Sequence, residues 1–156
     1  MNDYMKLADS LAKENAACNF TDGGPFGAVI IKEGKVVGKG KNSVIKDHDP
    51  SAHAEVNAIR DACNTLKTHD LTGCILYSSC YPCPMCLSLA VWANIKEIYY
   101  GNTKEDAASI GFRDDFIYDI LKNMKTQSEL KLINLGREET IKTFEDFENN
   151  NNKIMY

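Results

Sequence analysis

The order of apolar periodicities along this chain of 156 residues predicts an α/β protein, a three-layer α/β/α sandwich around a mixed five-stranded sheet. Two observations carry this prediction. After an amphipathic first helix, β-rich runs and helix-period segments follow one another in the order β-β-α-β-α-β-α-β, which is typical of a sheet covered by helices on both faces. The composition, with 44% hydrophobic residues and no internal repeat, is sufficient for one packed core, so we expect a single domain over residues 1–156.

The first third of the chain predicts a helix followed by a hairpin. Apolar side chains recur at helical spacing over residues 3–17. A Gly-Gly-Pro break follows, and then two short β-rich runs at residues 26–31 and 36–40 enclose a turn at Glu33-Gly34. Two such runs around a glycine turn are typical of a β-hairpin.

The middle of the chain alternates between helices and strands. Residues 53–66 carry an apolar stripe at helical spacing, whereas residues 74–78 form a short apolar run typical of a buried strand. Residues 86–93 are apolar on most sides and predict a covered helix, and residues 95–100 predict the next strand. This alternation supplies the crossover connections that a sheet with parallel strands requires.

The last third of the chain predicts two helical segments at residues 104–109 and 115–123, then a fifth strand at residues 130–135. A last helix is expected at residues 138–148, and residues 149–156 form a polar run with an apolar end. The apolar stripe of the last helix is expected to face the core through Ile141, Phe144 and Phe147.

Net charge and hydropathy exclude several function classes. A formal net charge of −4 and a pI near 5.4 argue against a dedicated nucleic-acid binder, which normally presents a basic face. The longest uninterrupted apolar run, residues 89–93, is far short of the ~20 residues of a membrane span, and the chain opens with no signal-peptide pattern. We therefore expect a cytoplasmic protein that binds neither a membrane nor nucleic acid.

Three of the six cysteines are crowded into one segment, at Cys80, Cys83 and Cys86. In a cytosolic chain such crowding indicates metal or redox chemistry. Cys83 and Cys86 lie three residues apart at a predicted helix start, where free backbone N–H groups and the helix dipole favour thiolates. His53, at the start of another predicted helix, can supply a third ligand, and three ligands leave a fourth position of a zinc tetrahedron open to water.

The residue that turns this zinc site into a catalyst is Glu55, two residues after the histidine. Zinc lowers the pKa of its bound water to about 7, so that hydroxide is available at neutral pH. Glu55 would take the proton from that water and deliver it to a ring nitrogen and then to a departing amine. The pattern thus predicts hydrolytic deamination of an amidine-like carbon in a heteroaromatic ring.

Simpler interpretations exist for each motif alone. A Cys-x-x-Cys pair is often half of a structural zinc site or a redox pair, and three crowded cysteines also occur in iron–sulfur proteins. The fourth cysteine of an iron–sulfur run is missing, because Ala90 occupies that stretch. The two motifs together, each at a predicted helix start, favour one catalytic Zn2+ per chain.

The combination His-x-Glu with Pro-Cys-x-x-Cys is the signature of zinc nucleobase deaminases. On it, and on the segments at residues 24–30 and 111–118, the chain resembles the cytidine-deaminase superfamily, and within it the small bacterial guanine deaminases of the cytidine-deaminase-like type. The resemblance implies the cytidine-deaminase-like fold and a homodimer in which the C-terminal segment is exchanged. It further implies hydrolysis of guanine to xanthine and ammonia by a zinc-bound hydroxide.

The resemblance also implies roles for further residues. Asn42 would hydrogen-bond the purine, and Asp114 would meet the substrate's amino edge as a second catalytic carboxylate. Phe26 and Trp92 would form apolar walls, and Tyr156 would close the pocket of the partner subunit. Each has a plainer interpretation: a helix cap for Asp114, core packing for the two aromatic walls, and a frayed chain end for the tyrosine.

Other functions remain open at this point. The zinc signature is shared by tRNA adenosine deaminases and by guanosine or cytosine deaminases, and a zinc-stapled binding domain without catalysis would use the same ligands. The acidic balance argues against tRNA, because backbone contacts dominate nucleic-acid affinity. One departure from the resembled family is Tyr81, where glutamate is usual, and we expect it to change the pocket rim and not zinc binding.

Overall fold

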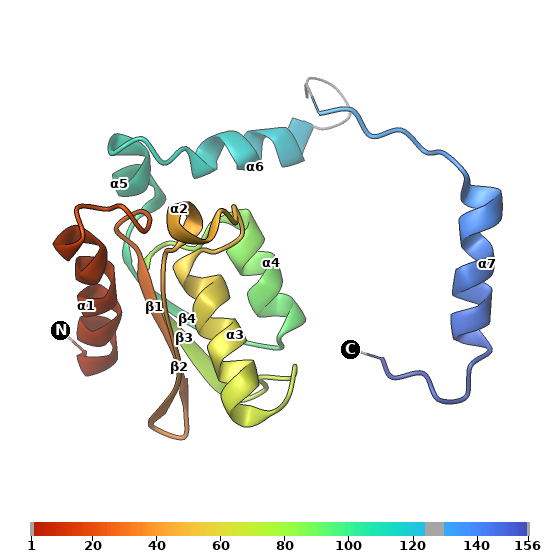
Figure 1. Ribbon diagram of the computed structural model, residues 1–156, viewed down its shortest axis with the longest axis horizontal. Coiled ribbons are helices and arrows are strands. Elements are labelled where there is room, and N and C mark those ends of the chain that lie inside the picture. Colours follow the sequence, from red (N-terminus) through yellow and green to blue (C-terminus); the bar gives the residue numbers. More distant parts are fainter. Residues whose placement is uncertain (1, 124–129, 156) are drawn as a thin grey trace. The chain divides into compact units, whose positions relative to one another are not determined.

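The computed structural model describes residues 2–123 and 130–155 (Figure 1). The chain divides into two compact units, Met1–Tyr118 and Asp119–Tyr156, and each is described by itself. The first unit contains the helices α1 (Asp3–Ala17), α2 (Val44–Asp47), α3 (Ala54–Leu66), α4 (Pro84–Trp92) and α5 (Lys104–Ser109), the strands β1 (Gly27–Lys32), β2 (Lys35–Lys41), β3 (Cys74–Cys80) and β4 (Glu97–Asn102), and the start of α6 (Asp114–Asn123). The second unit contains the rest of α6 and α7 (Arg137–Glu148).

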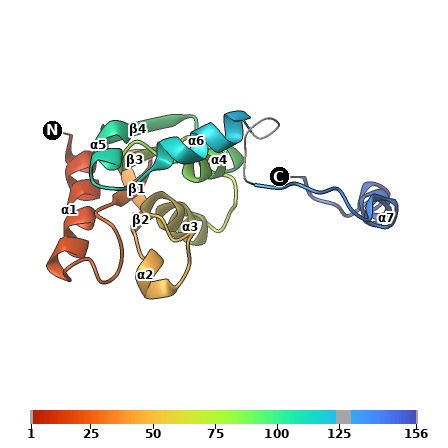
Figure 2. The ribbon, with the colours of Figure 1, turned by 90° about the horizontal axis from the view of Figure 1, so that it is seen from above.

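The strands form one mixed sheet in the order β2-β1-β3-β4, which can be followed in Figure 2. β1 pairs antiparallel with β2 and with β3, whereas β3 and β4 run parallel and are joined through α4. The hairpin turn and the helix crossover are thus both present where the sequence predicts them. The mixed α/β sheet is confirmed.

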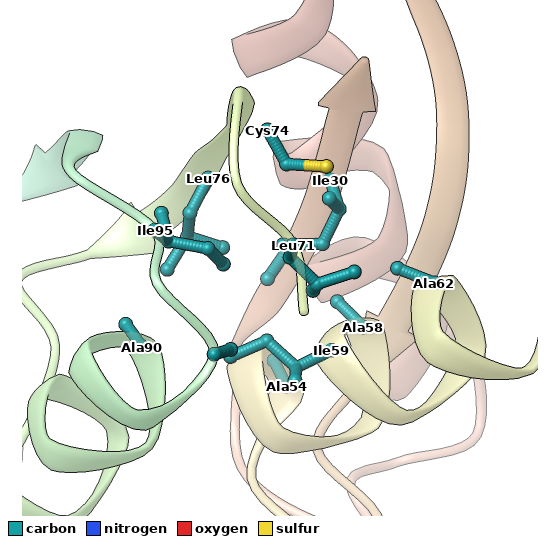
Figure 3. Close-up of a cluster of buried hydrophobic side chains, with 12 residues drawn as sticks. Ile30, Ala54, Ala58, Ile59, Ala62, Leu71, Cys74, Leu76, Ala90 and Ile95 are labelled. Atoms are coloured by element: carbon teal, nitrogen blue, oxygen red, sulfur yellow. The ribbon is translucent and has the colours of Figure 1, made fainter. Parts of the chain in front are cut away.

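Helices cover both faces of the sheet because the side chains of β1 alternate between them. Val29 and Ile31 pack with Tyr77 against α1, whereas Ala28 and Ile30 face α3 and α4. The α3 face holds the larger core, in which Ile30 and Leu76 are fully buried beside Leu71 (Figure 3). Burial of one such side chain stabilises the fold by roughly 1.5–3 kcal/mol.

α3 lies close to β2, and the glycines of β2, Gly38 and Gly40, make this possible. A Cβ atom at Gly40 would stand 2.2 Å from the carbonyl oxygen of Ala54, which is a backbone atom that cannot move aside. The close approach brings the first turn of α3 to the end of the hairpin. As a result, the start of α3 and the residues that follow β2 line one common region of the molecule.

The structure corrects the prediction of a fifth strand: the sheet described has four strands, and residues 130–135 are irregular. An alternating apolar pattern becomes a strand only when a neighbouring strand supplies its hydrogen bonds. These residues pair with no strand in the described parts of the chain, and Leu135 is 89% exposed. The apolar pattern of residues 130–135 therefore marks an exposed apolar segment and not a strand of this sheet.

α7 confirms the predicted last helix but not its predicted burial. Phe144 and Phe147 are exposed and Ile141 is only half-buried, so the stripe does not face a core within the described residues. The short helix α2 was not predicted, because four residues between polar neighbours carry no periodicity. None of the helices described has the length and hydropathy needed to cross a membrane.

Candidate metal centre and catalytic pocket

The three predicted metal ligands meet at the starts of two helices. His53 is the N-cap of α3, Cys83 is the N-cap of α4, and Cys86 lies in the first turn of α4. Pro84 occupies the first helical position, where its missing N–H removes no hydrogen bond. Because an N-cap residue has extended backbone, His53 and Cys83 reach beyond the helix ends toward the same point.

The distances within this triad suit zinc. The Sγ atoms of Cys83 and Cys86 are 3.6 Å apart, and each lies 3.6 Å from Nδ1 of His53. Tetrahedral coordination with Zn–S bonds of about 2.3 Å and Zn–N bonds of about 2.0 Å separates such ligand atoms by about 3.5–3.8 Å. The three ligand atoms therefore already hold the separation that one zinc ion requires, with one position left open.

Electrostatics at the triad favour a thiolate. The pKa of Cys83 is lowered to about 4, first by the hydrogen bond with Cys86 and further by His53. Both helices also direct their N-terminal ends, with their partial positive charge, at the triad. The Cys83 thiol is therefore a thiolate at neutral pH, the form that binds a metal ion.

Glu55 lies in the first turn of α3 and is almost completely buried, with 6% of its surface exposed. Ser78 of β3 donates a hydrogen bond to its Oε1 at 2.9 Å, and Oε2 is 3.5 Å from Sγ of Cys86. Burial raises the pKa of this carboxyl, opposed by hydrogen bonds from its backbone N–H and from Ser78. A carboxylate held beside the metal ligands, with a raised pKa, has the properties of a general base.

A cavity of about 570 Å³ opens over this centre. Phe26 lines one wall and meets the ring of Phe112 edge to face, with the ring centroids 4.8 Å apart. Such apolar walls with a few polar groups at one end are typical of a small-molecule site. The other predicted residues that line the cavity are Asn42, His53, Glu55, Cys83 and Asp114.

The orientation of the Asn42 amide is determined by its neighbours. Its Oδ1 accepts hydrogen bonds from the backbone N–H groups of Gly24, at 3.2 Å, and Val44, at 3.3 Å. Since backbone N–H groups can only donate, the oxygen must face them. Nδ2 is therefore the atom that Asn42 can offer to a ligand, and it could only donate a hydrogen bond to it.

Asp114 is the first residue of α6, half-buried at the cavity wall. Burial raises its pKa, and the negative charge of Cys83 adds to this. Tyr81, the departure noted in the sequence, also lines the cavity, and its ring packs edge-on against Tyr100 with centroids 4.9 Å apart. The expected effect of this departure on the pocket rim stays a prediction.

One predicted residue is not brought to this cavity, and another is not described. Trp92, at the end of α4, is 65% exposed and does not belong to the residues lining it, and Tyr156 lies outside the described residues. Sequence reasoning missed Phe112 and Ser78. Phe112 stands inside a segment that was singled out, and Ser78 is a polar residue in a buried strand, which was the only signal it offered.

Comparison with known proteins agrees with this geometry. Residues 1–102 match the family described as the cytidine and deoxycytidylate deaminase zinc-binding region. Guanine deaminase of Bacillus subtilis (strain 168) is 42% identical over 153 residues, which cover 98% of this chain and 97% of the relative. Both the zinc-binding region and the C-terminal segment of the chain therefore have counterparts in one relative.

Solved structures extend the likeness to three dimensions. The X-ray structure of guanine deaminase from Bacillus subtilis superposes with a TM-score of 0.90 at 41% identity, covering 100% of this chain and 99% of that one. A structure of NE0047 in complex with 2,6-diaminopurine has a TM-score of 0.66 at 30% identity, covering 71% and 61% of the two chains. With its zinc triad and its buried glutamate in place, the chain belongs to the cytidine and deoxycytidylate deaminase zinc-binding family, and within it is a homologue of bacterial guanine deaminase.

Proposed function

We propose that this protein deaminates guanine: guanine and water yield xanthine and ammonia. The observation that carries the proposal is Glu55, buried beside the triad of His53, Cys83 and Cys86 at the base of an aromatic-walled cavity. A purely structural zinc site has four protein ligands and no use for an adjacent buried carboxylate. The likeness to guanine deaminase over nearly the whole chain supports the choice of base.

The chain's own residues have separate tasks in this reaction. Zinc, when bound by the triad, supplies a Lewis acid that lowers the pKa of water. Glu55 accepts a proton from the attacking water through its Oε2, since Oε1 accepts the hydrogen bond of Ser78 and Oε2 lies toward the metal ligands, 3.5 Å from Sγ of Cys86. It delivers that proton to a ring nitrogen as the C–O bond forms. It then transfers the proton of the newly added hydroxyl to the amino group as the C–N bond breaks, so that its carboxylate is restored when ammonia leaves. Asp114, which also lines the cavity, would hold the amino edge of the base.

Recognition of the base rests on Asn42 and the two phenylalanines. The Nδ2 group of Asn42 donates to an acceptor, such as the oxygen or N7 of guanine, and Phe26 and Phe112 provide the faces on which a purine packs. Purine binding is also seen in the related NE0047 complex with 2,6-diaminopurine. We assign the enzyme to the cytoplasm and to purine breakdown; the six cysteines, none of which is paired in a disulfide, suit a reducing compartment.

The decisive experiment measures ammonia release from guanine, guanosine, adenine, cytosine, cytidine and a tRNA anticodon stem, with zinc assayed on the same preparation. Turnover of guanine with about one zinc per chain is expected. Preference for another substrate would retain the chemistry and refute guanine. Zinc without turnover on any substrate would refute the enzyme and favour a zinc-stapled binding domain.

We further propose a homodimer in which residues 149–156 of one subunit reach the cavity of the other. Support comes from apolar side chains that stay exposed in the second unit, among them Leu132, Ile133 and Phe144. Exposed apolar surface of this kind marks an interface in soluble proteins. Trp92, exposed on α4, would then act as an apolar wall only within the assembled dimer.

The tail proposal is tested by deleting Ile154–Tyr156. We expect guanine turnover to fall while the zinc content and the dimer persist, because the triad lies wholly in the first unit. An unchanged rate would remove Tyr156 from the site. Sedimentation velocity of the full chain tests the dimer directly, and a monomer at all concentrations would refute it.

A further inference from the structure

Asn15, near the end of α1, is fully buried although no step of the reaction uses it. Its Nδ2 donates one hydrogen bond to the carbonyl oxygen of Gly24, at 2.7 Å, and another to the carbonyl oxygen of Asn42, at 2.8 Å. The two acceptors are 18 positions apart in the sequence and belong to two separate segments of the cavity wall. One side-chain amide outside the cavity therefore joins two segments that line it.

The bonds form a closed circuit around the ligand-facing amide. Asn15 donates hydrogen bonds to the backbone carbonyls of Gly24 and Asn42. The N–H of Gly24 in turn donates a hydrogen bond to Oδ1 of Asn42. The packing is tight, since a Cβ atom at Gly23 would stand 2.2 Å from that Oδ1. The side-chain amide of Asn42 therefore keeps its orientation only while the distance between the Gly24 segment and the Asn42 segment is maintained.

The side-chain oxygen of Asn15 indicates that this residue does more than stabilise the fold. Its Oδ1 is buried with no hydrogen-bond partner in the described structure. A buried acceptor without a partner lowers stability, and a leucine of similar shape would avoid that cost. What the asparagine adds is the pair of donors that joins the two wall segments.

We propose that Asn15 is the positioning residue for substrate recognition: it sets the Gly24 and Asn42 segments so that Nδ2 of Asn42 faces the acceptor of the base. This inference rests on the proposed function, in which Asn42 binds the purine. Because the Asn42 contact is made equally before and during the attack, its loss weakens ground-state and transition-state binding alike. The KM for guanine rises in that case while kcat is retained.

The test compares Asn15→Leu, which keeps the shape and removes both donors, with Asn15→Ala, which leaves polar space for a water to bridge the two carbonyls. Tyr4→Phe serves as the matched control, since it removes a 2.8 Å hydrogen bond from the same helix to the carbonyl of Gly34, far from the cavity. We expect Asn15→Leu to raise KM roughly ten-fold, Asn15→Ala to raise it less, and Tyr4→Phe to leave it unchanged. The zinc content and kcat stay near wild type in all three.

Hydrogen exchange gives a readout that does not depend on the substrate. In Asn15→Leu the amides of Gly24 and Val44, which donate to Asn42, should exchange faster, whereas the amide of Gly27, bonded to Ser79 Oγ at 3.0 Å, should not change. In wild type the Nδ2 protons of Asn15 should themselves be protected. If wild type fails to deaminate guanine, the proposed function is refuted while these exchange rates still test Asn15. Unprotected Nδ2 protons, or an unchanged KM with unchanged exchange, would overturn the positioning role.

Discussion

Two regions of this chain treat their apolar side chains in opposite ways. Residues 2–118 bury them against both faces of a sheet and place the metal triad at the same end of two helices. The described residues from 119 onward, 119–123 and 130–155, keep theirs largely exposed, with Ile133 at 81%. The contrast teaches that the metal ligands and the core around them can form within one region, while the apolar pattern of another region is left uncovered in the described residues and fits the proposed contact with a second subunit.

Zinc removal should have the largest effect and tests whether the two regions are independent, because all three metal ligands belong to the first region. Chelation should reduce guanine deamination to background, and added zinc should restore it. The apparent Tm should also fall, since zinc binds only the folded triad. Sedimentation of the apo protein is the control: the oligomeric state should persist, and its loss would show that the two regions depend on one metal.

Glu55→Gln should have the next largest effect. The amide keeps the shape and the hydrogen bond from Ser78 but cannot accept a proton, so kcat should fall by about 10²–10⁴-fold. Zinc content, measured on the same sample by atomic absorption, should remain near one per chain. Retained turnover in protein free of contaminating deaminase would contradict the proton-transfer role.

Ser78→Ala should lower kcat less, and in a way that depends on pH. The Ser78 hydrogen bond lowers the pKa of Glu55, so its loss raises that pKa further and leaves less carboxylate at a given pH. The acidic limb of the kcat profile should therefore move to higher pH, and the deficit should shrink as pH rises. A deficit equal at every pH would indicate a structural defect instead.

Two leucine substitutions, one in each region, compare how much an apolar side chain contributes to the free energy of unfolding. Leu76→Ala, in the core of the first region, should lower the free energy of unfolding by about 2–5 kcal/mol. Leu135→Ala, 89% exposed within the chain, should change it by less than about 0.5 kcal/mol at concentrations where the chain is monomeric. At dimeric concentrations its effect should grow if residues 130–135 are covered by a partner. Chemical denaturation at two protein concentrations measures both, and equal effects at both concentrations would argue against that contact.

The sequence predicted the elements of the first region closely and failed where burial had to be inferred. The helix at 3–17, the hairpin and the crossover were correct because local periodicity and turn residues decide them. The fifth strand at 130–135 and the inward-facing stripe of α7 were wrong, since periodicity shows which face is apolar and not what covers it.

The sequence by itself determined the chemistry: the residue types of His53, Glu55, Cys83 and Cys86 at their spacings left few alternatives to a zinc deaminase, because zinc and proton transfer each demand particular side chains. Only the tertiary structure decided which groups orient them. Ser78 on β3 hydrogen-bonds Glu55, and Asn15 on α1 hydrogen-bonds the backbone carbonyl of Asn42 in the cavity wall. Both come from elements distant in the sequence, and no local pattern marks a hydrogen bond formed between separate elements. Residue types and their spacing indicate the reaction, whereas tertiary packing determines how the reacting side chains are oriented.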